Sequence, residues 1–151
     1  LQANVKDLKI YGYECHAYVD LITSVSSYFE ASMDLLKEEV RNDLFDGDNQ
    51  IFTKIRDEVP TVYRNGSQVK NSLIADGCII EGTVENSIIF RGVKIRKGAV
   101  VSNSIIMQAG EIQAGSQLNY VIADKDVVIR ENRKLFGYQK YPTVLSKGSV
   151  V

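Results

Sequence analysis

The sequence is poor in the residues that build metal sites, disulfides and membrane spans. Its 151 residues include one histidine and two cysteines, and no apolar run approaches the length that spans a bilayer. Cys15 and Cys78 are not spaced as metal ligands, which favours two reduced thiols in a cytoplasmic protein. The formal net charge of -1 gives no support for a broad surface that binds nucleic acid or an anionic membrane.

Proline is also scarce, and its absence marks the region that organises the chain. No proline occurs between Thr61 and Tyr141, so every backbone N–H in this region is free to donate to a neighbouring strand. The same region repeats itself. Its anchor residues are asparagines spaced by 15, 17 and 16 residues, namely Asn71, Asn86, Asn103 and Asn119.

A fixed period with short runs of Val and Ile is typical of a stacked solenoid. The runs are too short and too rich in β-branched residues for helices. Gly and Asn stand between them and accept the positive φ angles of tight corners. We predict three short faces per turn, turns hydrogen-bonded at roughly 4.8 Å, and four turns reaching about 20 Å. A last partial turn and a capping strand are expected within residues 135–145, where they would cover the terminal edge.

Two adjacent aliphatic residues follow each anchor. Because neighbours in a strand point to opposite faces, one row must fill the solenoid and the other must lie outside it. The outer row makes an apolar patch, from which we predict a contact with a partner subunit. The pairs are Leu73-Ile74, Ile88-Ile89, Ile105-Ile106 and Val121-Ile122.

The first 50 residues have a different pattern. Two short β-prone runs, 9–13 and 17–19, predict strands at the edge of a sheet whose remainder is absent from this chain. An apolar stripe then predicts one helix over about residues 25–42, capped by Thr23 or Ser24 and followed by the helix-breaking residues 46–49. Residues 51–53 are expected to be extended. We place a domain boundary near residue 50, with a strand-and-helix segment over 1–50 and the solenoid over 51–151. Because the chain opens at Leu1 without Met, we expect it to be a segment of a longer protein.

The histidine count argues against two enzyme classes that use stacked solenoids. Acyltransferases of this kind rely on a histidine base on the stack, and the corresponding carbonic anhydrases need three histidines for their metal. This chain has only His16, outside the repeats. We expect His16 to be an ordinary residue of the N-terminal sheet.

One corner carries a charge where the others are small. The position six residues after the anchor is Gly or Ala in three repeats but Lys125 in the fourth, flanked by Asp124 and Asp126. An exposed charged turn at the end of the stack is the simplest interpretation. The alternative is that the ammonium acts as a point charge for a phosphate or another anion, because functional sites often break a local pattern.

Several segments resemble the glucose-1-phosphate adenylyltransferases (ADP-glucose pyrophosphorylases). Residues 71–80, 84–87, 104–107 and 122–125 are similar to the repeats of their C-terminal domain. Residues 51–53 together with 59–60 are similar to their linker. The resemblance implies a mainly β fold: a left-handed parallel β-helix of hexapeptide repeats, preceded by a strand–helix segment from the end of a nucleotidyltransferase domain. The hand comes from the family, since the general rule for parallel crossovers favours the right hand. The helix after the family's catalytic sheet is matched by Tyr28-Phe29-Glu30-Ala31-Ser32-Met33-Asp34-Leu35-Leu36.

The resemblance also implies a departure from catalysis. An Asp in the family motif Tyr-Trp-Arg-Asp-Val-Gly-Thr helps to hold the metal, and residues 18–24 align with that motif. Leu21 stands at the place of the Asp, and leucine cannot ligate a hard cation. Asp20 is one residue away and would point to the other face of a strand, unless the alignment slips by one. This departure is similar to the regulatory branch of the family, which pairs with a catalytic homologue in glycogen biosynthesis.

As a member of that branch, the segment would be regulatory and would contain no catalytic residue, metal ligand or cofactor of its own. The whole assembly would make ADP-glucose and pyrophosphate from ATP and glucose 1-phosphate with Mg²⁺. Expected partners are the catalytic homologue or a second copy of the chain, and a sugar phosphate or other anionic effector. In several family members an Asp-Lys pair contacts the effector, which assigns effector binding to Asp124 and Lys125. A catalytic subunit that uses Asp20, or a plain scaffold without an effector site, are the alternatives.

Overall fold

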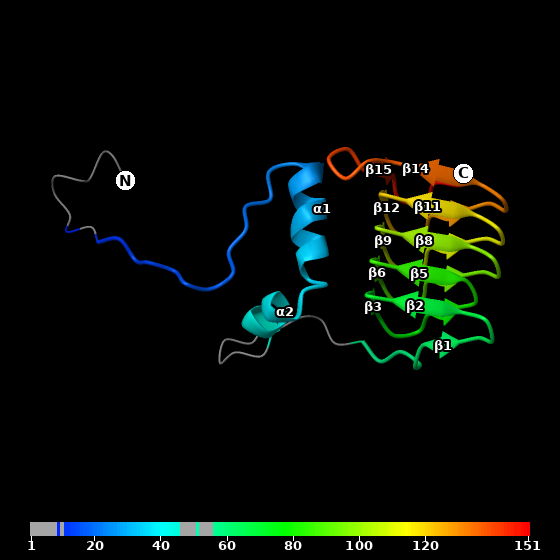
Figure 1. Ribbon diagram of the computed structural model, residues 1–151, viewed down its shortest axis with the longest axis horizontal. Coiled ribbons are helices and arrows are strands. Elements are labelled where there is room, and N and C mark those ends of the chain that lie inside the picture. Colours follow the sequence, from blue (N-terminus) through cyan, green and yellow to red (C-terminus); the bar gives the residue numbers. More distant parts are fainter. Residues whose placement is uncertain (1–8, 10, 46–50, 52–55) are drawn as a thin grey trace.

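The computed structural model describes residue 9, residues 11–45, residue 51 and residues 56–151. Two helices, α1 (Val25–Asp34) and α2 (Glu38–Phe45), precede a stack of short strands (Figure 1). None of the helices in this described part has the length and apolarity needed to span a bilayer. The strands are β1 (Val62–Tyr63), β2 (Gln68–Lys70), β3 (Leu73–Ile74), β4 (Ile79–Ile80), β5 (Thr83–Glu85), β6 (Ile88–Ile89), β7 (Lys94–Ile95), β8 (Val100–Ser102), β9 (Ile105–Ile106), β10 (Glu111–Ile112), β11 (Gln117–Asn119), β12 (Val121–Ala123), β13 (Val128–Ile129), β14 (Lys134–Phe136) and β15 (Thr143–Leu145).

The strands form three parallel sheets, and each turn of the chain contributes one strand to each sheet. Sheet A has the order β1-β4-β7-β10-β13, sheet B has β14-β11-β8-β5-β2, and sheet C has β15-β12-β9-β6-β3. The predicted parallel β-helix is therefore confirmed. The turn expected within residues 135–145 supplies β14 and β15, which hydrogen-bond to the preceding turn as the prediction requires.

The fourth repeat is in register one residue later than the sequence spacing suggested. Asn119 pairs with Ser102, so the corner above Asn103 is Tyr120. Tyr120 has a φ of 54°, close to the 44° of Asn103. The aliphatic pair of this repeat is therefore Ile122-Ala123 and not Val121-Ile122. Three apolar residues in a row follow the corner here, so the alternation of apolar residues did not fix the phase.

The inside of the coil is filled by stacked aliphatic side chains. Four isoleucines of sheet A have no exposed surface, and sheets B and C contribute similar rows. Each layer packs on the layer before and after it, so the core is continuous along the stack. The rows that meet at the centre include Ile80, Ile95, Ile112 and Ile129 of sheet A, and Val84, Val101 and Leu118 of sheet B.

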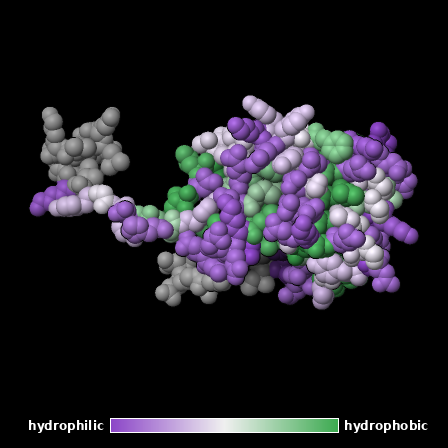
Figure 2. Space-filling view, viewed as in Figure 1, coloured by the Kyte–Doolittle hydropathy of each residue, from purple (hydrophilic) through white to green (hydrophobic). Residues whose placement is uncertain are grey.

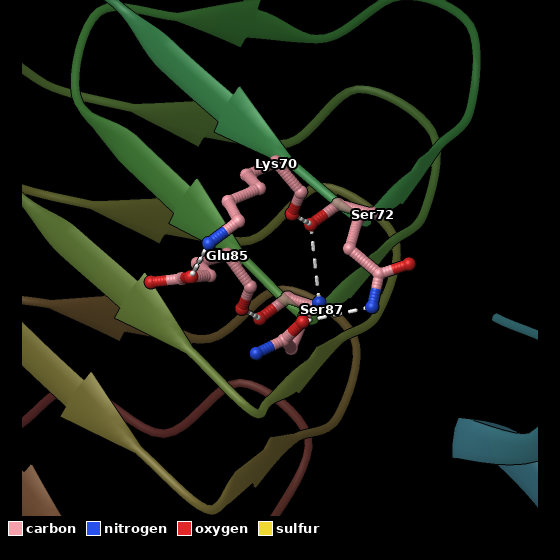
Figure 3. Close-up of polar contacts among 6 residues, drawn as sticks. Lys70, Ser72, Glu85 and Ser87 are labelled. Carbon is pink, nitrogen blue, oxygen red and sulfur yellow. Dashed lines mark hydrogen bonds and ion pairs between the residues drawn. The ribbon is translucent and has the colours of Figure 1, made fainter.

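A column of serine hydroxyls supports the corner between sheets B and C (Figure 3). The Ser72 hydroxyl donates to the carbonyl of Lys70 and accepts the backbone N–H of Ser87, at 2.8 and 3.1 Å. Ser87 repeats both contacts one turn later, with Glu85 and Ser104. The hydroxyls thus satisfy backbone N–H groups that the short strands leave unpaired, which would be costly inside the protein.

The outer row of sheet C is covered by helix α1, which runs along the stacking direction beside β6, β9 and β12 (Figure 1). Phe29 packs against Ile105 and Ile122, and these three side chains are at most 4% exposed. The sequence correctly predicted an inner and an outer row. The chain's own helix α1 covers part of the outer row, and the contact of this row with another subunit stays a prediction.

Two helices occupy the region predicted to hold one. Ser24 caps α1 through a capping box with Ser27. The N–H groups of residues 35–37 then donate to carbonyls three residues back, which tightens and ends the helix. The Arg41 guanidinium donates to the carbonyl of Leu35 at 2.8 Å and holds the turn. The apolar stripe continued through this turn because α2 also buries one residue, Val40.

The predicted N-terminal strands do not form among the described residues, and because the rest of their expected sheet is not part of this chain they stay a prediction. Residues 11–23 contain no strand, and Tyr11 and Tyr13 are 84% and 91% exposed. A β-prone run forms a strand only when a neighbour pairs with its backbone, and no described strand pairs with this segment. His16 is accordingly an exposed residue outside any sheet. The extended contact predicted for residues 51–53 and the breaker at 46–49 lie almost wholly outside the described residues, and the boundary near residue 50 stays a prediction.

Candidate functional site

Lys125 belongs to a column of residues at the corner between sheets C and A. The N–H of Gly148 donates to the carbonyl of Lys125 at 2.9 Å, just as the N–H of Asp126 donates to Gln108 one turn earlier. This bonding stacks Lys147 on Lys125. From the first turn to the last, the column contains Asp76, Arg91, Gln108, Lys125 and Lys147.

The stacking corrects the sequence argument for Lys125. The row of small corner residues continues through Asp126 and Gly148, which have φ angles of 60° and 69°. Lys125 lies one position earlier, in a column that already holds the charged Arg91. It therefore does not interrupt the pattern of small residues. The assignment of Asp124 and Lys125 to an effector site consequently stays a prediction that depends on the family resemblance.

The charges around this corner are nearly balanced. An Asp124 carboxylate oxygen accepts the backbone N–H of Lys125 at 2.7 Å and so fixes the turn. The Lys147 ammonium lies 4.0 Å from the Asp126 carboxylate, and both side chains are more than half exposed, so the pair adds little stability. Within the described ranges, Lys125 makes no ion pair, which leaves its ammonium available to an anion.

A hollow of about 470 Å³ lies between α1 and the corner that joins sheets B and C. Its coil side is the column of corner residues Asn71, Asn86, Asn103 and Tyr120. Its helix side includes Glu30, Met33, Asp34 and Lys37. The face that Figure 2 draws is mostly hydrophilic with smaller apolar patches. We call this hollow the asparagine groove.

A sequence profile described as "GlmU-like, C-terminal hexapeptide" matches residues 59–140, more than half of the chain. The chain belongs to this hexapeptide-repeat family. The match agrees with the parallel coil and with the left-handed β-helix that the resemblance implied.

Relatives of this hexapeptide-repeat protein confirm the resemblance to glucose-1-phosphate adenylyltransferases and to a protein of glycogen biosynthesis. It is 43% identical over 143 residues to the glycogen biosynthesis protein GlgD of Bacillus subtilis (strain 168), covering 95% of this chain and 42% of that protein. It is 56% identical over 71 residues to GlgD of Geobacillus stearothermophilus, covering 47% and 21%. The glucose-1-phosphate adenylyltransferase of Bacillus cereus (strain Q1) is 32% identical over 123 residues, covering 82% and 33%. The chain thus spans less than half the length of these curated relatives.

The two residues considered for the family's metal site, Asp20 and Leu21, are both exposed. Leu21 is 76% exposed, and an Asp20 carboxylate oxygen accepts the N–H of Leu21 at 2.7 Å. In the described part of this family member, no three His, Cys, Asp or Glu side chains are placed to hold a metal ion together. Whether Asp20 takes part in metal binding therefore stays a prediction.

Sequence reasoning missed Lys147 and the asparagine groove. Lys147 follows Lys125 by more than one ordinary repeat, because a loop bridged by Tyr138 and Tyr141 lengthens the last turn. The glycines that recur at this corner, the last of which is Gly148, were the signal that could have identified Lys147. The groove could not be found from the repeats, since one of its walls is α1.

Proposed function

We propose that this chain is the β-helix region of a regulatory, non-catalytic subunit that works with a glucose-1-phosphate adenylyltransferase in glycogen biosynthesis. The observation that carries the proposal is the difference between its relatives. The identity to a GlgD protein is 43% over 95% of the chain, whereas the identity to the adenylyltransferase is 32% over 82%. Leu21, where the resemblance expects a metal-binding Asp, supports the same choice.

In this proposal, Lys125 contacts an anionic effector such as a sugar phosphate. Its side chain is exposed and unpaired in the described residues, and Lys147 adds a second ammonium on the next turn. A lysine ammonium acts as a point charge for phosphate. A carboxylate in direct contact with a phosphate would repel the phosphate. Asp124 would therefore act indirectly, by holding the turn through its hydrogen bond from the Lys125 N–H.

The catalytic homologue would supply the chemistry of the proposed assembly. It would bind ATP, glucose 1-phosphate and Mg²⁺, and this chain would change its response to the effector. The rigid coil suits such a role, since its continuous core links the turn that carries Lys125 to the sheet under α1.

The test uses the full-length protein that contains this chain, alone and mixed with its catalytic homologue. ADP-glucose formation from ATP and glucose 1-phosphate with Mg²⁺ is measured with and without sugar-phosphate effectors. We expect no product from the protein alone. In the mixture, Lys125→Ala should weaken the effector response. Lys94→Ala, which removes an exposed lysine from sheet A, is the matched control and should leave the response intact.

Two results would overturn the proposal. Product formed by the protein alone would identify a catalytic subunit and restore Asp20 as a candidate ligand. An effector response that is the same in Lys125→Ala and Lys94→Ala would show that the corner is not the effector site.

A further inference from the structure

The asparagine groove has the dimensions of a ligand site. Its volume of about 470 Å³ lies within the range of roughly 300–1,000 Å³ that is usual for such sites. Because the corner residues on its coil side come from four successive turns, the groove extends about 15 Å along the stack. It is therefore long enough for a linear molecule lying along the column.

The amide ladder on the coil side is interrupted in the middle of the groove. The Asn71 amide donates to the side-chain oxygen of Asn86 at 2.8 Å. The corner above Asn103 is Tyr120, which has no side-chain amide to continue the ladder. The Asn103 amide therefore donates to the side-chain oxygen of the neighbouring Asn119, also at 2.8 Å. No hydrogen bond joins Asn86 to Asn103 in the described structure. The Asn86 amide donor and the Asn103 amide oxygen consequently lie on adjacent turns without a protein partner.

The helix side adds carboxylates and excludes anions. Asp34 pairs with Lys37 at 2.8 Å and accepts a hydrogen bond from the Tyr18 hydroxyl at 3.3 Å. Glu30 is exposed and makes no ion pair among the described residues. The formal charges of Glu30, Asp34 and Lys37 therefore leave one negative charge on this wall. That charge disfavours a phosphate here and separates the groove from the corner at Lys125.

Apolar surface completes the groove. Met33 and Tyr120 are partly buried, and the Tyr120 ring lies 6.0 Å from the ring of Phe29 beneath it. Side-chain amides, carboxylate acceptors and an aromatic ring can together bind both the hydroxyls and the C–H faces of a sugar. A neutral polyhydroxylated ligand uses all of these groups and meets no unfavourable charge.

We propose that the asparagine groove binds a neutral oligosaccharide. The Asn86 amide donates a hydrogen bond to one sugar hydroxyl. The amide oxygen of Asn103, on the adjacent turn, accepts a hydrogen bond from a second hydroxyl. On the opposite wall the Glu30 carboxylate accepts one from a third hydroxyl, and the sugar ring packs on Met33 and Tyr120. This site is independent of the proposed function, which only guides the choice of an α-linked glucose oligomer as the first probe.

The experiment is a titration of the 151-residue chain with maltotriose and with cellotriose, followed by calorimetry and by NMR of the side-chain amides. We expect at least one of the two to bind with a Kd on the order of 1 mM and to shift the Asn86 and Asn103 resonances. Asn86→Asp keeps the acceptor for Asn71 and the tolerance for positive φ, but it removes the amide donor. It should weaken binding about fivefold.

Asn119→Asp is the matched control, because it makes the same change two turns from Asn86 while keeping the acceptor for Asn103. Its affinity should equal that of the unchanged chain. The proposal is overturned if neither sugar binds, or if the two variants lose affinity equally. Glucose 1-phosphate is titrated in parallel. Shifts at Lys125 from this anion, without any shift from the neutral sugars, would remove the groove site and leave the proposed effector corner standing.

Discussion

Ile105 and Ile106 are neighbours in β9, and neither has any exposed surface. Ile106 lies inside the coil, where it packs in a row that every turn repeats. Ile105 points the other way and is buried by Phe29 of α1. Equal burial therefore has two different origins in adjacent residues. The inner core is formed by equivalent residues that stack in successive turns. The outer core depends on one helix, so it can be lost while the coil stays folded.

The inner core should be the more sensitive of the two. Ile106→Ala opens a cavity between turns that cannot collapse, so it should lower the free energy of unfolding by about 3–5 kcal/mol. Denaturant unfolding followed by the β signal in circular dichroism measures this loss. Ile106→Val is the control and should cost about 1 kcal/mol. A loss below that of the control in Ile106→Ala would place the residue outside the core.

The outer core should separate from the coil when its anchor is removed. Phe29→Ala should cost about 3 kcal/mol of α1 docking, with loss of helical signal but retention of the β transition. Amide hydrogen exchange should then quicken in α1 and stay slow in the inner strands. Simultaneous loss of both signals would contradict the separation of the two cores.

The serine column tests whether polar corners also stabilise the coil. Ser87→Ala leaves the buried N–H of Ser104 without its acceptor, which should cost about 1–3 kcal/mol. Ser26→Ala on α1 removes a hydroxyl that makes no hydrogen bond in the described structure and should change stability by less than about 0.5 kcal/mol. Thermal unfolding of both variants gives the comparison, and equal midpoints would show that the column is dispensable.

The smallest expected effect is on the pH dependence of stability, and it involves the two thiols. Burial raises the pKa of the Cys78 thiol above its ordinary value of 9.0. The folded state therefore keeps its proton while the unfolded chain loses it, so this contribution to stability is complete below pH 9.0 and is lost as the pH rises toward the folded-state pKa. Cys78→Ala should lose less stability than the unchanged chain as the pH rises across this range. Cys15→Ala, at an exposed thiol, should follow the unchanged chain, and identical curves for the two variants would refute the assignment.

Much of the coil could be predicted because its physics is periodic. The spacing of the asparagines and the aliphatic pairs predicted stacked parallel strands, and the alternation within each pair predicted an inner and an outer row. The phase of the fourth repeat was not determined, since Val121, Ile122 and Ala123 satisfy two registers. Only backbone pairing of Asn119 with Ser102 resolves them.

The N-terminal region was less predictable because its structure depends on contacts that are not local. The β-prone runs lacked a strand to pair with, and the stripe from Val25 to Val40 did not reveal the turn at residues 35–37. For the candidate sites, the Asp124-Lys125 assignment came from a resemblance, and the pattern cited for it was in the wrong register. The asparagine groove needed the docking of α1, which no repeat encodes.

The second core and the asparagine groove both exist because α1 lies over the outer row of sheet C. The direct measurement is a set of NMR nuclear Overhauser effects between the Phe29 ring and the methyl groups of Ile105 and Ile122. We predict strong cross-peaks to both methyl-bearing residues, together with slow amide exchange in α1. Absent cross-peaks, with α1 amides exchanging as in an unfolded peptide while the coil stays protected, would contradict this position of α1.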